Sequence, residues 1–246
     1  MKMIDTHAHL QVDAYDHDRN EVISRTLAAN IACINVGTSF ATSKSAVELA
    51  AKHDGFYAAI GLHPTDVDEE FDSQQYRDLA KSKKVVAIGE IGLDYFREPY
   101  NKEKQKDIFL RQIALAKELN LPVIIHCRKA HDEMLEMLKG QGLRGVIHCF
   151  TGTLQQAQKY VELGFYLGMN GIMFKFPLEE VIKNIGLEHM LLETDCPYLT
   201  PPMAPGKRNE PIFMKYTIEK IAELKKVSVQ EVADKTTTNA KKLFGI

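Results

Sequence analysis

Histidines and carboxylates follow short apolar runs along this chain. The first run carries two histidines with one residue between them. They lie in the segment Met3-Ile4-Asp5-Thr6-His7-Ala8-His9. Alternate side chains of a strand point to the same face, so both imidazoles would reach one ion. A lone His-x-His pair also fits two surface or packed histidines, so a metal site requires ligands from other segments.

Other apolar runs end in the same way. Glu90 follows Ala87-Ile88-Gly89, His126 follows Val123-Ile124-Ile125, and two more runs lead to His148 and Asp195. If the fold gathers these ends at one rim, the imidazoles and carboxylates would repel or remain unsatisfied without a cation. We therefore predict a metal site built from His7, His9, Glu90, His126, His148 and Asp195.

The runs themselves are short and β-branched, as strands are. We expect eight strands, at Met3 to Thr6, Ile31 to Val36, Tyr57 to Ile60, Val85 to Ile88, Pro122 to Ile125, Gly145 to Ile147, Phe165 to Gly168 and Met190 to Leu192.

Amphipathic segments separate these runs. We expect helices at Glu21 to Ala29, Ser43 to Lys52, Gln74 to Lys83, Lys102 to Leu119, Asp132 to Leu138, Gln155 to Leu163 and Leu178 to Ile185. Eight strands separated by seven helices in about 250 residues are typical of a single-domain (β/α)₈ TIM barrel spanning 1–246. An open doubly wound sheet is the alternative, because periodicity does not prove closure. In a barrel, the candidate ligands would meet at the C-terminal ends of the strands.

Charge and composition limit the function. The 246 residues include 31 basic and 33 acidic side chains, a net charge of −2. This balance excludes a protein that holds nucleic acid by overall basicity, but not an enzyme that grips phosphate locally. Neither a signal peptide nor a membrane-spanning run is recognisable, so we expect a cytoplasmic protein with no membrane partner. No segment indicates a protein partner, and we expect a monomer.

Four cysteines, Cys33, Cys127, Cys149 and Cys196, lack the C-x-x-C spacing of zinc or redox sites. Three directly follow candidate ligands, and the next residue of a strand points the other way. We therefore expect them to be small buried residues facing the covering helices, and not ligands.

Six segments resemble the TatD family of metal-dependent deoxyribonucleases, within the amidohydrolase-type barrels. They begin at Ile4-Asp5-Thr6-His7-Ala8-His9-Leu10, and the others are Ile60-Gly61-Leu62-His63-Pro64, Gly89-Glu90-Ile91-Gly92-Leu93-Asp94-Tyr95, Pro122-Val123-Ile124-Ile125-His126-Cys127-Arg128, His148-Cys149-Phe150-Thr151-Gly152 and Glu193-Thr194-Asp195-Cys196-Pro197. The motifs run in order over nearly the whole chain. Gln11 departs from the Asp or Asn that the family usually has there.

The resemblance implies two divalent ions, of zinc, manganese or magnesium. His7, His9, Glu90 and Asp195 would hold one ion, and His126, His148 and a bridging Glu90 the other. Two such ions activate a water for hydrolysis of a DNA phosphodiester, with Asp195 as proton acceptor and Glu90 as the second catalytic carboxylate.

The resemblance also indicates substrate-binding residues. Arg128 would clamp a phosphate, although a surface ion pair is its alternative. His63 would contact phosphate or donate a proton, or else be a packed histidine. Asn209 and Glu210 would support the ligand-bearing segments without binding the metal ions themselves. The proline-rich segment from Pro197 to Pro211 would form a wall over the strand ends or only shape a crossover.

Of two other functions, the first remains compatible with these residues. The same metals would polarise the carbonyl of a small amide or ester, and near-neutral charge does not favour DNA. A non-catalytic barrel would require a broken ligand set, whereas this one is intact.

Overall fold

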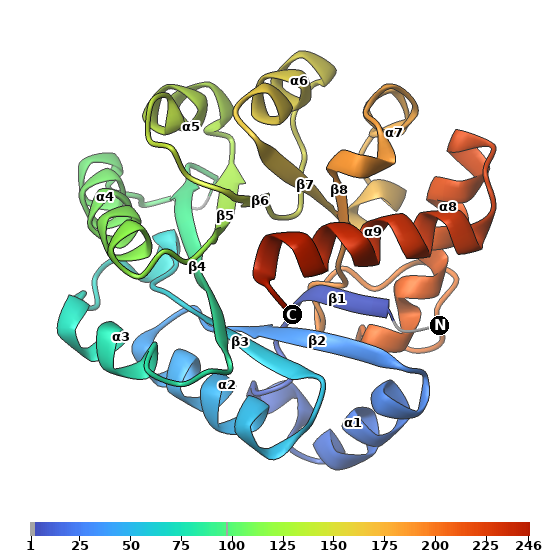
Figure 1. The fold of residues 1–246 in the computed structure, drawn as a ribbon, viewed down its shortest axis with the longest axis horizontal. Coiled ribbons are helices and arrows are strands. Elements are labelled where there is room, and N and C mark those ends of the chain that lie inside the picture. Colours follow the sequence, from blue (N-terminus) through green and yellow to red (C-terminus); the bar gives the residue numbers. More distant parts are fainter. Residues whose placement is uncertain (1–2, 97) are drawn as a thin grey trace.

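The computed structural model describes residues 3–96 and 98–246, and eight parallel strands form one sheet within these ranges (Figure 1). In order they are β1 Met3–Ala8, β2 Ile31–Val36, β3 Phe56–Ile60, β4 Val85–Asp94, β5 Val123–Arg128, β6 Gly145–Ile147, β7 Phe165–Met169 and β8 Met190–Leu192.

Each strand pairs with the next along the chain, and all these pairs are parallel. β8 approaches β1 at one parallel bridge between Ala8 and Cys196, where the Asp195 amide also donates to the His7 carbonyl at 2.8 Å. The sheet is therefore a nearly closed barrel, which confirms the predicted (β/α)₈ fold over an open doubly wound sheet.

Helices connect the strands and cover the outside of the barrel. They are α1 Arg19–Ala28, α2 Phe40–Lys52, α3 Ser73–Leu79, α4 Lys102–Glu118, α5 His131–Leu138, α6 Leu154–Glu162, α7 Glu179–Asn184, α8 Met214–Lys225 and α9 Val229–Phe244. Capping boxes begin α2 at Ser39 and α6 at Thr153. On α4, Phe109, Ile113 and Ala116 recur at helical spacing and form a buried stripe against the sheet.

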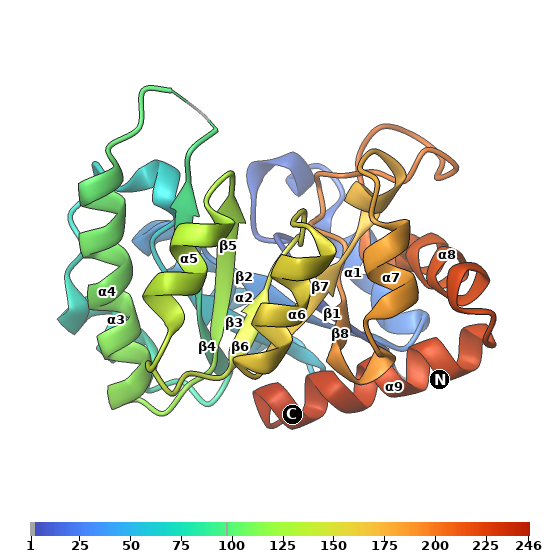
Figure 2. The same cartoon turned by 90° about the horizontal axis from the view of Figure 1, so that it is seen from above.

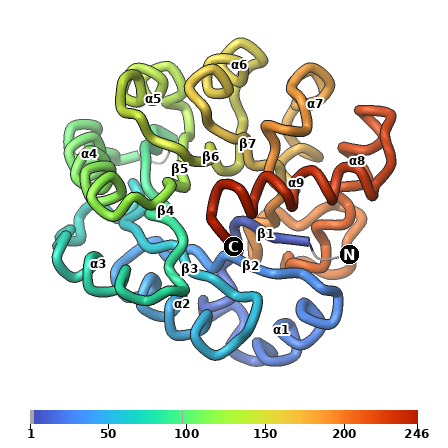
Figure 3. The backbone as a smooth tube through the Cα atoms, in the orientation of Figure 1, coloured from blue at the N-terminus to red at the C-terminus, as the bar shows by residue number. Residues whose placement is uncertain are grey.

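Helix α9 closes one end of the barrel. Its Ala240, Leu243 and Phe244 pack with Ile4 and Ile34 in the interior. The tube in Figure 3 shows α9 crossing this end, and Figure 2 shows the loops that follow the strands on the opposite side. Only the C-terminal end of the barrel is thus left for a site, as the fold predicts.

β4 and β5 extend beyond their predicted ends. Glu90 does not end β4, which continues to Asp94, and His126 lies within β5. The two strands remain paired there, with Gly92 opposite His126 and Asp94 opposite Arg128. Gly92 has a φ of 146°, and a Cβ on it would lie 1.9 Å from the His126 carbonyl oxygen, so only glycine permits this approach.

Candidate metal centre

Glu90 lies at the centre of the predicted ligands and is 4% exposed. Its carboxylate reaches imidazole nitrogens from three other elements. The distances are 3.3 Å to His7 Nε2, 2.8 Å to His126 Nδ1 and 3.7 Å to His148 Nε2. A carboxylate surrounded in this way has the position of a bridging ligand.

Asp195 closes the same cluster from the β8 side. Its Oδ1 lies 3.4 Å from His9 Nε2, 3.8 Å from His7 Nε2 and 3.9 Å from His148 Nε2. All six predicted ligands therefore meet at the C-terminal rim, although they come from five strands or the residues just after them. Five of them form two groups of three whose potential ligand atoms lie within 4.8 Å of one another, His7 with His9 and Asp195, and His7 with Glu90 and His148. The sixth, His126, forms such a group with Glu90 and His63.

The polar contacts of three histidines leave one nitrogen of each directed at this cluster. His9 Nδ1 lies 2.7 Å from the Val36 carbonyl, which can only accept, so His9 carries a proton on Nδ1 and turns Nε2 toward the cluster. His148 Nδ1 lies 2.9 Å from Glu193. His126 Nε2 lies 2.9 Å from Asp94, which leaves Nδ1 toward Glu90. This arrangement of oriented imidazoles fits a divalent cation.

His63 differs from these histidines. Its Nδ1 accepts from the Thr65 backbone N–H at 3.1 Å, so neutral His63 carries its proton on Nε2, 3.5 Å from Glu90 Oε1. Burial lowers the pKa of His63 and favours this neutral form. The side chain thus offers a proton, and not a lone pair, to the cluster. That suits the substrate or proton-donor role expected of it better than ligation.

The carboxylates are charged despite burial. Burial alone would raise the pKa of Glu90, but the neighbouring His63, His7 and His148 hold it well below its ordinary value. Burial likewise opposes the shift at Asp195, where the hydrogen bond with His9 and the nearby His148 lower the pKa. Asp195 is therefore deprotonated at neutral pH and able to accept a proton.

Three buried carboxylates that support the ligands were not among the predicted site residues. Asp94 orients His126, and Glu193 orients His148 and accepts from the Cys149 backbone N–H at 2.8 Å. Asp5 bonds Thr194, joining the ends of β1 and β8, and burial raises its pKa to about 7 although these bonds lower it. Their signal was a carboxylate within or directly after a largely apolar strand, where burial requires a partner.

Asp94→Asn is expected to lower metal affinity and activity by about 10- to 100-fold, as loss of a ligand-orienting partner does. Asp94 accepts from both His126 and the Phe96 backbone N–H, and a single amide oxygen cannot serve both. Calorimetric metal titration and cleavage rates check this expectation, with exposed Asp107→Asn as the control. Equal affinities for the two variants would contradict it.

The cysteines follow the prediction only in part. Cys127 faces outward, where the Tyr160 hydroxyl lies 3.8 Å from its sulfur, and Cys196 is fully buried. The outward prediction is wrong for Cys149, whose sulfur lies within 4.8 Å of ligand atoms of His148 and Asp195. Cys149 lies after the end of β6 with a φ of 45°, so strand alternation no longer determines its direction.

The predicted substrate residues occupy different positions. Arg128 lies at the end of β5 with its Cζ 3.7 Å from the centre of the Phe96 ring. Asn209 is buried and donates from Nδ2 to the carbonyls of Thr194 and Tyr198. Glu210 pairs with Arg25 at 2.6 Å. Asn209 thus holds the backbone on both sides of Asp195, whereas Glu210 joins this segment to α1 through Arg25.

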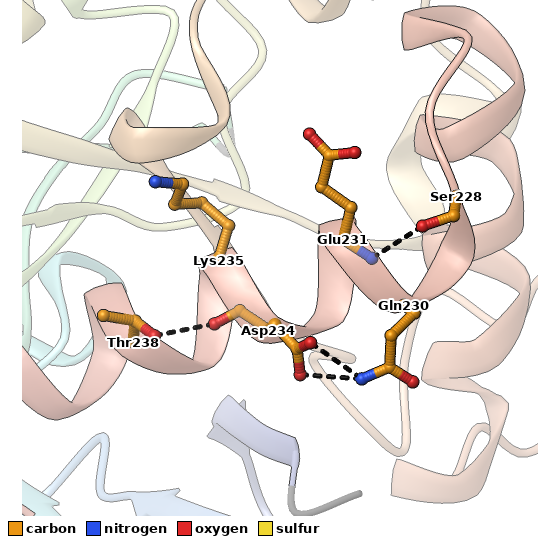
Figure 4. Close-up of a pocket in the computed structure, with 6 residues that line it drawn as sticks. All are labelled: Ser228, Gln230, Glu231, Asp234, Lys235 and Thr238. Carbon is orange, nitrogen blue, oxygen red and sulfur yellow. Dashed lines mark hydrogen bonds between the residues drawn. The ribbon is translucent and has the colours of Figure 1, made fainter.

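A surface hollow on α9 is unrelated to this centre (Figure 4). Gln230 donates to Asp234 at 2.8 Å, and the Glu231 amide donates to the capping Ser228. These bonds satisfy the helix itself, and α9 lies at the opposite end of the barrel (Figure 2).

Comparison with known proteins identifies the family. The sequence profile described as TatD related DNase matches residues 4–245. The chain belongs to the TatD family. Its resemblance to that family is therefore confirmed over nearly the full length, and it is a metal-dependent hydrolase of this nuclease family.

Relatives of this TatD-family chain include a metal-dependent hydrolase, YabD of Bacillus subtilis, 45% identical over 99% of each protein. The 3'-5' ssDNA/RNA exonuclease TatD of Escherichia fergusonii is 34% identical, again over 99% of each. The solved structure of YjjV, a TatD homologue from Escherichia coli, matches with a TM-score of 0.93 at 32% identity, covering 99% of this chain and 98% of YjjV. No helix in the described ranges is long and apolar enough to cross a membrane.

Proposed function

We propose that this protein is a nuclease that hydrolyses phosphodiester bonds of DNA with two divalent ions. The observation that carries the proposal is the cluster around Glu90, in which one buried carboxylate faces histidines from three elements. Exonuclease relatives that match the whole chain support a nucleic-acid substrate.

By resemblance to the family, His7, His9 and Asp195 would hold one ion together with Glu90. His126 and His148, which both approach Glu90, would hold the second. The mixed nitrogen and oxygen donors suit zinc, manganese or magnesium. When bound, the ions would supply Lewis-acid activation of water and charge stabilisation of the phosphoryl oxygens.

The protein side chains would position the substrate and transfer protons to and from the reacting groups. Asp195, kept charged by its histidine neighbours, would accept the proton of the attacking water. His63 would present its Nε2–H to a phosphate oxygen or to the leaving group. Arg128, at the end of β5, would hold a neighbouring phosphate.

The direct test begins with metal analysis of the purified protein. End-labelled single- and double-stranded DNA is then incubated with each divalent ion, beside a panel of small amides and esters. We expect cleavage of DNA, and the product ladder reveals exonuclease or endonuclease action. Turnover of an amide without any cleavage of DNA would overturn the proposal in favour of small-molecule hydrolysis.

Chelation is expected to abolish activity while the fold persists. The ligands lie at the C-terminal rim, whereas the buried apolar core fills the barrel and the space under its helices. Circular dichroism and thermal unfolding with and without chelator measure this separation. Cooperative unfolding on adding chelator at room temperature would contradict it.

A further inference from the structure

An exposed aromatic ring lies beside the end of β4 together with two cations. Phe96 is 47% exposed although it is a large apolar side chain. Arg128 Cζ lies 3.7 Å from its ring centre, and Lys129 Nζ lies 4.8 Å from it. Single exposed apolar side chains are ordinary on protein surfaces, so the mark of this place is the pair of cations against the ring and not the exposure alone.

This ring is tied to the metal centre by one carboxylate. Asp94 Oδ1 accepts from the Phe96 backbone N–H at 2.8 Å, and Asp94 Oδ2 lies 2.9 Å from His126 Nε2. A backbone hydrogen bond also fixes Phe96 relative to Arg128, because the Tyr95 amide donates to the Arg128 carbonyl at 3.0 Å. The ring and its two cations are therefore held at a fixed place relative to the predicted ligands.

The surrounding charge indicates what would bind. The whole chain carries a net charge of −2, so a polyanion must be held by local cations. Aromatic rings beside Arg or Lys bind unpaired bases by stacking, while the cations hold the adjacent phosphates. A base inside a duplex is stacked and paired and is not available to such a ring.

We propose that Phe96, Arg128 and Lys129 form a subsite for one nucleotide of single-stranded nucleic acid, the ring stacking on the base and the cations binding its phosphate. The proposal rests on the proposed nuclease function and adds to it a subsite that recognises one unpaired base. It assigns this base recognition to Phe96, outside the metal ligands.

The test compares two ligands of equal length and charge. One is a phosphorothioate-linked oligothymidylate, which resists hydrolysis, and the other is the same backbone with abasic residues. Fluorescence anisotropy measures their affinities for the metal-loaded protein. We expect Phe96→Ala to weaken binding of the oligothymidylate by roughly 5- to 100-fold, as loss of one stacked base does, and to leave the abasic ligand unchanged.

Further variants separate the ring from the cations. Phe96→Tyr keeps a flat ring and should retain affinity, whereas Phe96→Leu keeps only apolar volume and should not. Lys129→Ala should weaken both ligands equally and reduce the salt dependence of binding. Leu110→Ala removes an equally exposed apolar side chain on the outside of α4 and should change neither affinity.

Two results would overturn the subsite. One is an unchanged affinity of Phe96→Ala for oligothymidylate, and the other is an equal loss for both ligands, which would mean that the ring acts only by holding Arg128. In either case, DNA cleavage by the unaltered protein would leave the proposed function standing. If the unaltered protein neither binds these ligands nor cleaves DNA, both proposals are wrong. Metal content and thermal midpoints establish that each variant is folded.

Discussion

Asp195→Asn is expected to slow DNA cleavage by about 10² to 10⁴, the usual cost of losing a general base. The amide keeps the volume of the side chain and offers one oxygen to a metal, but it cannot take up a proton. Asp195 Oδ1 faces His9, His7 and His148, so its position at the rim is set by neighbours that the substitution leaves in place.

Metal content measured beside the cleavage rate at saturating metal tests this role. The variant should keep most of its metal while losing most of its rate. Asp107→Asn makes the same chemical change on an exposed residue of α4 and should affect neither quantity. Rescue of Asp195→Asn by excess metal would show that Asp195 acts mainly as a ligand.

Glu90→Gln should lose activity for a different reason than Asp195→Asn, namely because it loses metal. Glu90 faces His7, His126 and His148 and is 4% exposed, so its negative charge is shared by the whole cluster. Loss of a supporting group costs about 10- to 100-fold in metal affinity, and loss of the central charge should cost at least about 100-fold. The rate should fall largely because occupancy falls.

Titration of both apo variants with each divalent ion, followed by rate measurements across the metal range, separates the two roles. Excess metal should restore part of the Glu90→Gln rate, and exposed Glu136→Gln should behave as the unaltered protein. If excess metal rescues Asp195→Asn but not Glu90→Gln, the roles of the two carboxylates are the reverse of those proposed.

The alternation of strands and helices was predictable because it follows from the hydrophobic periodicity of short segments. All seven predicted helices exist with ends shifted by a few residues, and all eight strands exist in chain order. The ligands were recognisable for a related reason. A histidine or carboxylate directly after an apolar run stands where the C-terminal ends of barrel strands converge, so residue type and position together indicate the site.

Other features depend on register, which local patterns do not contain. β4 continues to Asp94 because it pairs with β5 through the close approach at Gly92. That extension brings Asp94 against His126 and Phe96 against Arg128. A strand that appears to stop at Glu90 would bring neither pair together.

Side-chain chemistry and hydrophobic period are properties of short segments, so the candidate ligands and the barrel that carries them could be predicted from the sequence. The supporting contacts of Asp94 and Glu193 and the inward direction of Cys149 became visible in the folded chain. They depend on how neighbouring strands are paired and on single backbone dihedrals beyond the strand ends. A φ of 45° at Cys149 reverses the direction that strand alternation predicts.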